Sequence, residues 1–343
     1  MPRASIIIPQ RNEPRLRETV ERAAETAGPE VEIIVVNDGL QDVPETVNRL
    51  ARVVTPWQQP LGLQMCRDYG IEHAHAETVI LLDAHMQFRD DSGWLDMLDD
   101  WSRANPRGIA CAICEGICPD RWAMAFDCEH CKKRADDLER MGAKRPAPPS
   151  LRYGARLLWT EKSLAQTGRD EYKVFPSKWH DKKGSAPGPV QSVLGGCYVM
   201  QRDWYLNGIG RPWRGMRAWG TSEQTLSICN WLCGGFCECL PVAVGHWFRK
   251  PNQVPYASAS GEPGGYDHQV GIWFNRWRLL SVLPMADSTR SELLDWLGEN
   301  HVRSGIEKKV RKWLCMDSES YKLKAHLSAQ RRTMEDYRKE WGL

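Results

Sequence analysis

The sequence predicts an α/β protein with a mixed, mostly parallel sheet that is flanked by helices and followed by a small helical C-terminal extension. Two apolar runs near the N-terminus, 5–9 and 32–36, are typical of strands buried on both faces. The segment between them, 15–27, has apolar residues at helical spacing, so the order is strand, helix, strand. Such a unit places its two strands in parallel through a right-handed crossover. From residue 286 onward the pattern is helical throughout.

The remaining elements follow from the same periodicities and from turn residues. A weak third strand at 53–54 and a helix at 62–74 precede the apolar run 79–82, which is a further buried strand. The stretch 249–265 is a long loop rich in Pro, Gly and Ser, of the kind that often closes over a ligand as a lid. The other predicted elements are helices at 93–103 and 220–232 and strands at 108–113, 190–200 and 236–244.

Two helices are expected in the C-terminal extension. Thr289 and Glu292 have the spacing of a capping box, which predicts that the first helix begins there. The second helix, around 306–314, is amphipathic. Its polar face is basic and is either an ordinary solvated surface or a contact for nucleic-acid phosphates. The basic residues of this face are Lys308, Lys309, Arg311 and Lys312.

The composition is that of a globular protein with an ample core. At 343 residues the chain divides into a main domain, 1–285, and the helical extension, 286–343. Hydrophobic residues at 42% and charged residues at 26% exclude a disordered chain, and the net charge of +2 indicates no particular partner. No apolar run has the length of a signal peptide core or a membrane span. We therefore expect a cytoplasmic protein without membrane contact, whose Cys residues are reduced or bound to metal.

A candidate metal site follows the strand 79–82. Asp83 and His85 lie two positions apart, so in extended backbone they point to the same side, about 7 Å apart. A carboxylate and an imidazole suit Mn²⁺ or another divalent cation, which a diphosphate leaving group needs. Asp38 ends the strand 32–36 and is expected at the same sheet edge, where α/β proteins bind ligands. The alternative is that Asp83 caps a turn and His85 is an ordinary residue at a strand end.

Seven motifs occur in a characteristic order along residues 4–280: ASIIIPQRNE, EIIVVNDG, LGLQMCRDYG, VILLDAHMQF, GGCYVMQRDWY, AWGTSEQTLSICNWLCGG and VGHWFRK. In this order they resemble nucleotide-sugar glycosyltransferases of the GT-A (Rossmann-like) fold. The pattern is most similar to the catalytic domains of polypeptide N-acetylgalactosaminyltransferases, and more widely to family-2 glycosyltransferases. The resemblance implies that 1–285 is a GT-A catalytic domain.

The resemblance also implies roles for the residues at the predicted sheet edge. Asp38 corresponds to a residue that binds the uracil or ribose of a UDP-sugar, and Arg67 to an Arg near the nucleotide. Asp83 and His85 occupy the Asp-x-His metal motif, and His246 matches the third ligand of the cation, which is expected to be Mn²⁺. Taken alone, His246 is also consistent with a hydrogen-bonded core histidine.

Further roles concern the transferred sugar and the lid. Trp219 and Glu223 stand where the family has Trp-Gly-Gly-Glu beside the sugar and the acceptor. Glu223 either takes the proton of the acceptor hydroxyl or orients the sugar. Arg249, proposed as catalytic, and Tyr256, proposed to bind the cofactor, fall in the stretch that matches the lid over the diphosphate. The insertion of Thr221–Ser222 in place of one Gly departs from the family pattern and puts the sugar pocket in question.

A Cys-rich insertion at 107–135 has no counterpart in those enzymes. Cys111-x₂-Cys114 and Cys128-x₂-Cys131 have nearly the spacing of a zinc ribbon, which makes these four residues candidate ligands of a structural Zn²⁺. Two further residues, Cys118 and His130, are spare ligands. The alternative is that Cys111 and Cys114 are small core residues of a strand.

These observations predict metal-dependent transfer of a sugar from a UDP-sugar to an acceptor hydroxyl. The basic helix, the possible zinc site and sixteen Trp favour a nucleic-acid acceptor. Similar glycosyltransferases are associated with hydroxymethylated pyrimidines of phage DNA and with the base-J pathway, so we expect transfer to 5-hydroxymethylpyrimidine in DNA. The alternatives are a cytosolic protein Ser/Thr or glycan as acceptor, or a zinc-stabilised nucleic-acid-binding protein with a degenerate transferase fold.

Overall fold

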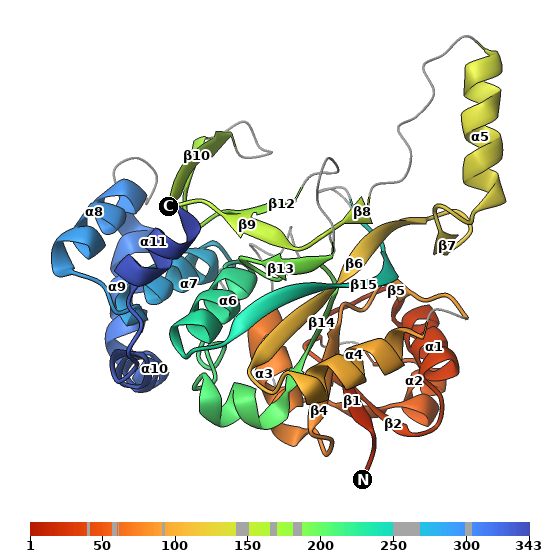
Figure 1. The fold of residues 1–343 in the computed structure, drawn as a ribbon, viewed down its shortest axis with the longest axis horizontal. Coiled ribbons are helices and arrows are strands. Elements are labelled where there is room, and N and C mark those ends of the chain that lie inside the picture. The colour runs from red at the N-terminus through yellow and green to blue at the C-terminus, as the bar shows by residue number, and fades with distance from the viewer. Residues whose placement is uncertain are drawn as a thin grey trace.

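The computed structural model (Figure 1) describes residues 1–39, 42–56, 60, 62–90, 93–141, 151–164, 170–180, 187–249, 268–298 and 304–343. Its central sheet has the strand order β13-β15-β6-β14-β4-β1-β2-β3. These strands are β1 (Ala4–Gln10), β2 (Val31–Asn37), β3 (Arg52–Val54), β4 (Thr78–Leu82), β6 (Gly108–Cys118), β13 (Gly188–Val190), β14 (Cys197–Gln201) and β15 (Phe236–His246). The helices along the sheet are α1 (Leu16–Ala27), α2 (Glu45–Leu50), α3 (Leu63–His73), α4 (Trp94–Ala104), the π-helix η1 (Trp204–Gly208) and α6 (Ser222–Leu232).

The sheet is mixed and mostly parallel. β1 pairs in parallel with both β2 and β4, and β2 pairs in parallel with β3. β14 runs antiparallel between β4 and β6, and β15 is parallel to β6. The strands β1, β2, β4, β6 and β15 therefore all end at the same edge of the sheet. The α/β class, the parallel crossovers and the flanking helices predicted from the sequence are confirmed.

Two hydrophobic clusters lie on opposite faces of this sheet. Ile6 and Ile8 of β1 pack in one cluster with apolar residues of α1 and α4. Ile7 points the other way and packs with residues of α3, η1 and α6. Ile80 and Leu82 of β4 alternate in the same manner with Val79 and Leu81. Burial on both faces explains why these strands are uninterrupted apolar runs in the sequence.

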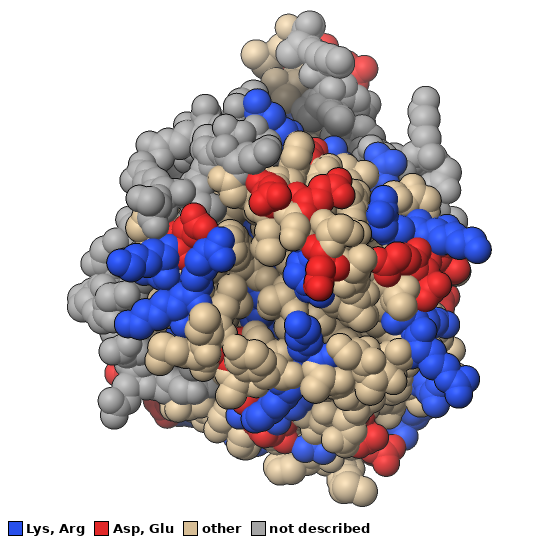
Figure 2. Space-filling view, turned by 90° about the vertical axis from the view of Figure 1, so that its left-hand side faces the viewer, with Lys and Arg blue, Asp and Glu red and all other residues tan. Residues whose placement is uncertain are grey.

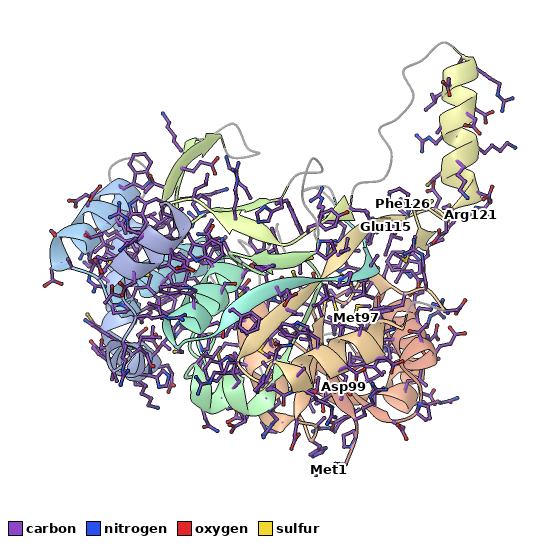
Figure 3. All side chains as sticks on the ribbon, viewed as in Figure 1. Met1, Met97, Asp99, Glu115, Arg121 and Phe126 are labelled. Atoms are coloured by element: carbon purple, nitrogen blue, oxygen red, sulfur yellow. The ribbon has the colours of Figure 1, made fainter. Side chains whose placement is uncertain are left out.

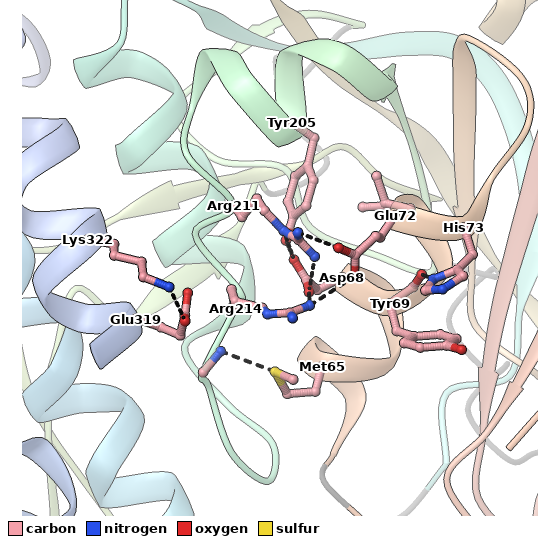
Figure 4. Close-up of polar contacts among 12 residues, drawn as sticks. Met65, Asp68, Tyr69, Glu72, His73, Tyr205, Arg211, Arg214, Glu319 and Lys322 are labelled. Atoms are coloured by element: carbon pink, nitrogen blue, oxygen red, sulfur yellow. Dashed lines mark hydrogen bonds and ion pairs between the residues drawn. The ribbon is translucent and has the colours of Figure 1, made fainter. Parts of the chain in front are cut away.

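A buried ion-pair network fixes helix α3 against the segment that follows η1 (Figure 4). Asp68 of α3 is fully buried and contacts Arg211 Nη2 at 2.9 Å and Arg214 Nη1 at 3.0 Å. The Tyr205 hydroxyl donates to the same carboxylate at 3.1 Å. Glu72, one turn later, also binds both arginines, and the Arg211 hydrogen bond lowers the pKa of Glu72 to about 2. Helix α3, which carries Arg67, is thus held firmly.

Shorter strands and one helix lie at the periphery of the main sheet. β5 (Met86–Gln87) pairs with β15, while β7 (Ala123–Met124) and β8 (Leu151–Arg152) pair with β6. Two small two-stranded antiparallel sheets pair β9 (Ala155–Leu157) with β12 (Ser177–Trp179) and β10 (Thr160–Leu164) with β11 (Asp170–Val174). Helix α5 (Glu129–Arg140) has no buried residue and projects away from the rest of the molecule (Figure 1).

The C-terminal helices pack beside α6. They are α7 (His268–Val282), α8 (Asp287–Gly298), α9 (Ser304–Met316), α10 (Ser318–Ser328) and α11 (Met334–Trp341). A third hydrophobic cluster joins Ile228 of α6 and Phe274 of α7 to Val310, Leu327 and Tyr337 of the later helices. The predicted helical extension is present, and because its core continues into α6 and α7, the domain boundary at residue 285 stays a prediction.

The helix starts in this region differ in part from the prediction. Helix α8 begins at Asp287, and the Arg290 N–H donates to the Ala286 carbonyl. Thr289 therefore lies inside the first turn and cannot be the N-cap. The capping box predicted at Thr289 and Glu292 is wrong. A capping box does form at Thr333 and Asp336, before α11. The amphipathic helix predicted around 306–314 is confirmed as α9. In the part of the chain that the structure describes, every helix is too short or too polar to cross a bilayer.

Candidate active site

Asp83, His85 and His246 converge at the edge where the strands end. Asp83 follows β4, His85 precedes β5, and His246 is the last residue of β15, which pairs with β5. One donor atom from each of the three side chains lies within 4.8 Å of the other two. His246 Nε2 is 3.2 Å from Asp83 Oδ2, and the two imidazole centroids are 4.8 Å apart. The sheet thus brings together the three residues that the sequence predicted as metal ligands.

Gly196 allows this close approach. It precedes β14, and its carbonyl accepts the backbone N–H of Asp83 at 2.8 Å. A Cβ atom at position 196 would lie only 2.6 Å from His246 Cδ2 and 2.6 Å from Met86 Sδ. Any side chain there would displace the imidazole, so the spacing of the ligands depends on a glycine at this position.

The buried guanidinium of Arg67 holds the Asp83 carboxylate in place. The guanidinium is 1% exposed, lies between the rings of Tyr198 and Trp213, and donates to Asp83 Oδ1 at 2.9 Å. Burial alone would raise the pKa of Asp83, but the hydrogen bond from His246 and the Arg67 charge outweigh it and hold that pKa well below its usual range. Asp83 is therefore ionised at neutral pH, as a metal ligand must be.

Glu13 and Arg249 hold His85 in the same way. The Arg249 guanidinium contacts Glu13 Oε2 at 2.5 Å and His85 Nδ1 at 2.7 Å. Glu13 Oε2 is itself 3.2 Å from His85 Nδ1. Glu13 and Arg249 are both 5% exposed, so this ion pair is shielded from water. Arg249 is the predicted catalytic residue, and it lies directly beside the proposed metal ligands.

The donor set fits a divalent cation. One carboxylate and two imidazoles suit Mn²⁺ and similar ions. Burial lowers the pKa of His246 despite its hydrogen bond to Asp83, so the ring is neutral and can offer a lone pair. His246 Nδ1 is buried and has no hydrogen-bond partner among the described residues. A neutral imidazole with an unpaired nitrogen, beside an ionised carboxylate, is what metal coordination requires.

The three ligands border a cavity of about 440 Å³ that Asp38 also lines. This volume lies in the range of small-molecule sites. Asp38 is 7% exposed, and its Oδ2 accepts the Gly62 N–H at 2.9 Å, which fixes the carboxylate at the cavity wall. Trp219 also lines the cavity and is 51% exposed. The remaining charged residues of the wall are Arg11, Glu13, Arg152 and Arg249.

Glu223 and Arg67 lie behind the cavity wall, since neither is among the described residues that line it. Glu223 Oε1 accepts the Tyr198 hydroxyl at 3.1 Å and Oε2 accepts the Ser222 hydroxyl at 2.6 Å. Its Oε1 is also 3.6 Å from Arg67 Nη1. Both oxygens therefore have partners, and Glu223 connects to the metal ligands through Arg67. Tyr256 and most of the predicted lid lie outside the described residues.

The cysteines form a different set from the predicted one. Cys111 and Cys114 are buried in β6, where Cys111 is opposite Cys239 of β15 and burial raises the pKa of Cys114 to about 12. They are core residues, and the predicted zinc set of Cys111, Cys114, Cys128 and Cys131 is wrong. Its second half, Cys128 and Cys131, instead lies with Cys118 and His130, the two spare ligands. The reason is that β6 continues to Cys118, so only this last cysteine reaches the start of α5.

Three residues of the site were not assigned roles from the sequence. Glu13 lies just beyond β1 in the motif ASIIIPQRNE, and a polar residue after a buried parallel strand was the signal that identified Asp38. Tyr198, inside the apolar strand β14, gave no such signal. Arg152 lines the cavity and stacks on Phe248 at 4.0 Å, but it comes from the short strand β8, which the sequence did not predict.

The mostly parallel sheet and the carboxylate and imidazole cluster at its edge define a protein of the GT-A fold. A solved structure of GalNAc-T7 with UDP, GalNAc and Mn²⁺ shares this fold, with a TM-score of 0.56 and 18% identity, over 95% of this chain and 58% of the other. Residues 5–146 match the family model for glycosyl transferase family 2. The matched segment is similar to family 2 glycosyltransferases, and the chain is homologous to polypeptide N-acetylgalactosaminyltransferases.

Two curated relatives illustrate this homology. Polypeptide N-acetylgalactosaminyltransferase 11 of Xenopus tropicalis is 28% identical over 282 residues, which cover 78% of this chain and 41% of the relative. The probable N-acetylgalactosaminyltransferase 7 of Caenorhabditis elegans is 25% identical over 277 residues, covering 77% and 42% respectively. The chain therefore spans less than half the length of these relatives.

Proposed function

We propose that this protein is a metal-dependent glycosyltransferase that moves a sugar from a UDP-sugar to an acceptor hydroxyl. The observation that carries the proposal is the convergence of Asp83, His85 and His246, within 4.8 Å of one another, in a cavity that Asp38 also lines. The homology to glycosyltransferases and the fold shared with a UDP- and Mn²⁺-bound structure support it.

The charges around the cavity fit the departure of a diphosphate. Asp83, His85 and His246 would hold the cation, which when bound would neutralise negative charge on the leaving phosphate. Arg249, held by Glu13 beside these ligands, adds a fixed positive charge at the same place. Asp38 would accept hydrogen bonds from the uracil or ribose, because its carboxylate is fixed by Gly62 at the cavity wall.

We assign Glu223 to positioning. Both of its carboxylate oxygens already accept hydrogen bonds, from Tyr198 and Ser222, and it lies behind the wall of the cavity. It therefore supports Arg67, and through Arg67 the ligand Asp83. Trp219 offers an exposed ring face at the cavity, where a sugar or a base can stack.

For the acceptor we propose 5-hydroxymethylpyrimidine in DNA. The exposed side chains of Lys308, Lys309 and Lys312 on α9 and the exposed ring of Trp219 support a contact with phosphates and bases. Figure 2 views the side on which the C-terminal helices lie, and Lys and Arg there are interspersed with Asp and Glu. Phosphate contacts on this face would therefore be few and local. All twelve cysteines lie within the described residues and are free thiols, which supports the cytoplasm as the compartment.

A polypeptide Ser or Thr is the second candidate acceptor. The specific observation in its favour is that the curated relatives are polypeptide N-acetylgalactosaminyltransferases. A hydroxyl of a side chain and a hydroxymethyl group on a base present similar nucleophiles to the transferred sugar, while UDP is the leaving group. The surface beyond the cavity must therefore distinguish the two acceptors.

The test is a transfer assay with purified protein, Mn²⁺ and a panel of UDP-sugars. Release of UDP is measured first without an acceptor, then with hydroxymethylated DNA, unmodified DNA and Ser/Thr peptides, and the products are identified by mass spectrometry. We expect UDP release from at least one donor and added sugar mass on hydroxymethylated DNA alone. Asp83→Asn is the inactive control.

Three other outcomes decide among the alternatives. Sugar on peptides and not on DNA contradicts the DNA acceptor and leaves the transferase intact. No binding or turnover of any UDP-sugar in the presence of Mn²⁺ contradicts the transferase itself. DNA binding that is equal in the wild type and Asp83→Asn, without turnover, supports a nucleic-acid-binding protein with a degenerate fold.

A further inference from the structure

A second group of potential metal ligands lies at the base of α5, apart from the cavity. It consists of Cys118 at the end of β6 and of Cys128, His130 and Cys131 around the start of α5. One donor atom from each residue lies within 4.8 Å of the other three, and Cys118 Sγ is 3.8 Å from His130 Nδ1. Three thiols and one imidazole form a Cys₃His set, which is a common composition of closed structural zinc sites.

Core packing does not account for this group. Cys118 and Cys128 are only 3% and 5% exposed, but the helix that follows them has no buried residue. In Figure 3 the side chains of α5 project into open space, with Arg121 and Phe126 near its base. Two ion pairs of α5, Lys132 to Glu129 and Arg140 to Asp137, join residues of the helix to each other, and His130 lies 3.9 Å from Asp120 in the loop before the helix. The cysteines and His130 thus lie where α5 meets the end of β6.

The backbone around these four residues is already folded as a compact loop. β7 pairs antiparallel with the end of β6, with Ile117 opposite Met124. The Trp122 N–H donates to the Cys118 carbonyl at 2.8 Å, and the Ala125 N–H donates to the Gly116 carbonyl at 2.8 Å. Cys128 is the N-cap of α5, where the helix dipole favours a thiolate. Three ligands at a helix start and one at a strand end can therefore close around one ion.

The loop also contacts the cavity described above. The ring of Trp122 packs edge-on against the ring of Trp247, with 5.8 Å between the ring centroids. The centroid of the Trp247 ring is in turn 6.5 Å from that of the His85 imidazole. A Cβ atom on Gly245, next to His246, would lie 3.0 Å from Ile117 and 3.1 Å from Met124. The loop 118–128 is thus packed against the end of β15, which supplies a proposed catalytic ligand.

We propose that Cys118, Cys128, His130 and Cys131 bind one structural Zn²⁺, which fixes the β6–β7 loop and the start of α5 beside the active site. The ion is separate from the catalytic cation, whose ligands are one carboxylate and two imidazoles. Thiolate ligands favour Zn²⁺, whereas the carboxylate site favours Mn²⁺. Binding releases the thiol protons, so the affinity for zinc increases with pH.

The first test measures the metal content of the full-length protein, purified under reducing conditions and passed over a chelating resin. We expect about one equivalent of zinc, and Co²⁺ exchange should give the thiolate charge-transfer band of a tetrahedral sulfur-rich site. Cys131→Ser and Cys118→Ser should each lower the zinc content at least about tenfold. The matched control is Cys315→Ser, an exposed cysteine on α9, which should keep all the zinc.

Asp83→Asn separates the two metal sites, because it disrupts the proposed catalytic site and should retain the zinc equivalent. The proposal is overturned if the wild type takes up neither zinc nor Co²⁺ with a thiolate band. It is also overturned if Cys131→Ser retains the ion that Asp83→Asn loses. Hydrogen exchange gives a readout independent of metal content: chelation should deprotect residues 118–141 and leave β4 protected, and unchanged protection of 118–141 contradicts the proposal.

Discussion

The two groups of proposed metal ligands in this protein are built in opposite ways. In the catalytic group, Asp83 and His246 are 163 residues apart in the chain and meet only because β4 and β15 end at the same sheet edge. In the cysteine group, the ligands come from one short segment, and three of them lie around the first turn of α5. The first group is thus a product of the fold, and the second is a local feature of the sequence.

The partners of the ligands differ in the same way. Asp83 is held by Arg67, and His85 by Glu13 and Arg249, so the catalytic ligands keep their positions through protein contacts alone. In the cysteine group, by contrast, the ion pair found among the described residues is a 3.9 Å contact of His130 with the exposed Asp120, and α5 contributes no buried residue. We therefore expect the first group to be organised before an ion binds and the second to depend on its ion for order. The following predictions test this difference.

The largest effect is expected when Arg67 is replaced. Arg67→Met leaves the Asp83 and Glu223 carboxylates without their buried counter-ion, so we expect the free energy of unfolding to fall by about 3–5 kcal/mol. Urea denaturation of the purified protein measures it. Arg49→Met, which breaks an exposed pair with Glu45, is the control and should cost less than about 1 kcal/mol. Equal effects of the two substitutions would show that the catalytic ligands are not held by Arg67.

A somewhat smaller effect, on activity, is expected for Asp83→Asn. The amide keeps the shape of the side chain but offers the cation no negative charge, so UDP release should fall by about 10²–10³-fold. The assay is turnover of the preferred UDP-sugar over a series of Mn²⁺ concentrations. Cys131→Ser should leave Mn²⁺ dependence in place, because it acts at the other group. If Asp83→Asn retains full turnover, the metal site lies elsewhere.

Acidification should weaken the metal-free protein through His246. Burial lowers the pKa of His246 in the folded state, so the unfolded chain takes up its proton first as the pH falls below about 6.5. We expect the free energy of unfolding to decrease by at most about 1.4 kcal/mol per pH unit in this range. The depressed pKa of Asp83 acts only at lower pH, below about 4. His246→Gln should flatten the pH profile, and an unchanged slope would contradict this assignment.

The smallest effect is expected on α5. Leu138 is partly exposed on a helix without buried residues, so Leu138→Ala should change the free energy of unfolding by no more than about 0.5 kcal/mol. The matched control is Leu98→Ala on α4, which is fully buried and should cost about 2–5 kcal/mol. Both are measured by urea denaturation. A large effect of Leu138→Ala would mean that α5 packs on a surface instead of being held at its base.

The sequence predicted most accurately the strands that are buried on both faces of the sheet. The strands β1, β2 and β4 are buried on both faces and are therefore apolar without interruption, and their positions agree with the prediction. The strand pairs β9–β12 and β10–β11 were missed, because segments such as Thr160–Leu164 are short, polar and lack the alternation of a half-buried strand. β6 was predicted too short, since Glu115 and Gly116 interrupt its apolar pattern although they continue the ladder with β15.

For the site, the sequence predicted which strand-end residues converge better than it predicted the residues that hold them in place. Asp83, His85, His246 and Asp38 all follow strands, and a polar residue after an apolar run is visible without a structure. The ion pairs of Arg67 with Asp83 and of Glu13 with Arg249 join distant parts of the chain, and no periodicity reveals them. The cysteine set was wrong in half of its members, because spacing alone does not show where a strand ends.

Gly196 has a consequence for how the catalytic group can change. Its carbonyl fixes Asp83, and its missing side chain leaves the space that the His246 imidazole occupies. The distance between ligands from two separate strands is therefore set by a residue that is not a ligand and carries no charge. A side chain at this position would move the imidazole and so change the spacing of the donor atoms, without changing which atoms they are. In a library designed to change which cation the proposed site prefers, position 196 is the one to randomise first.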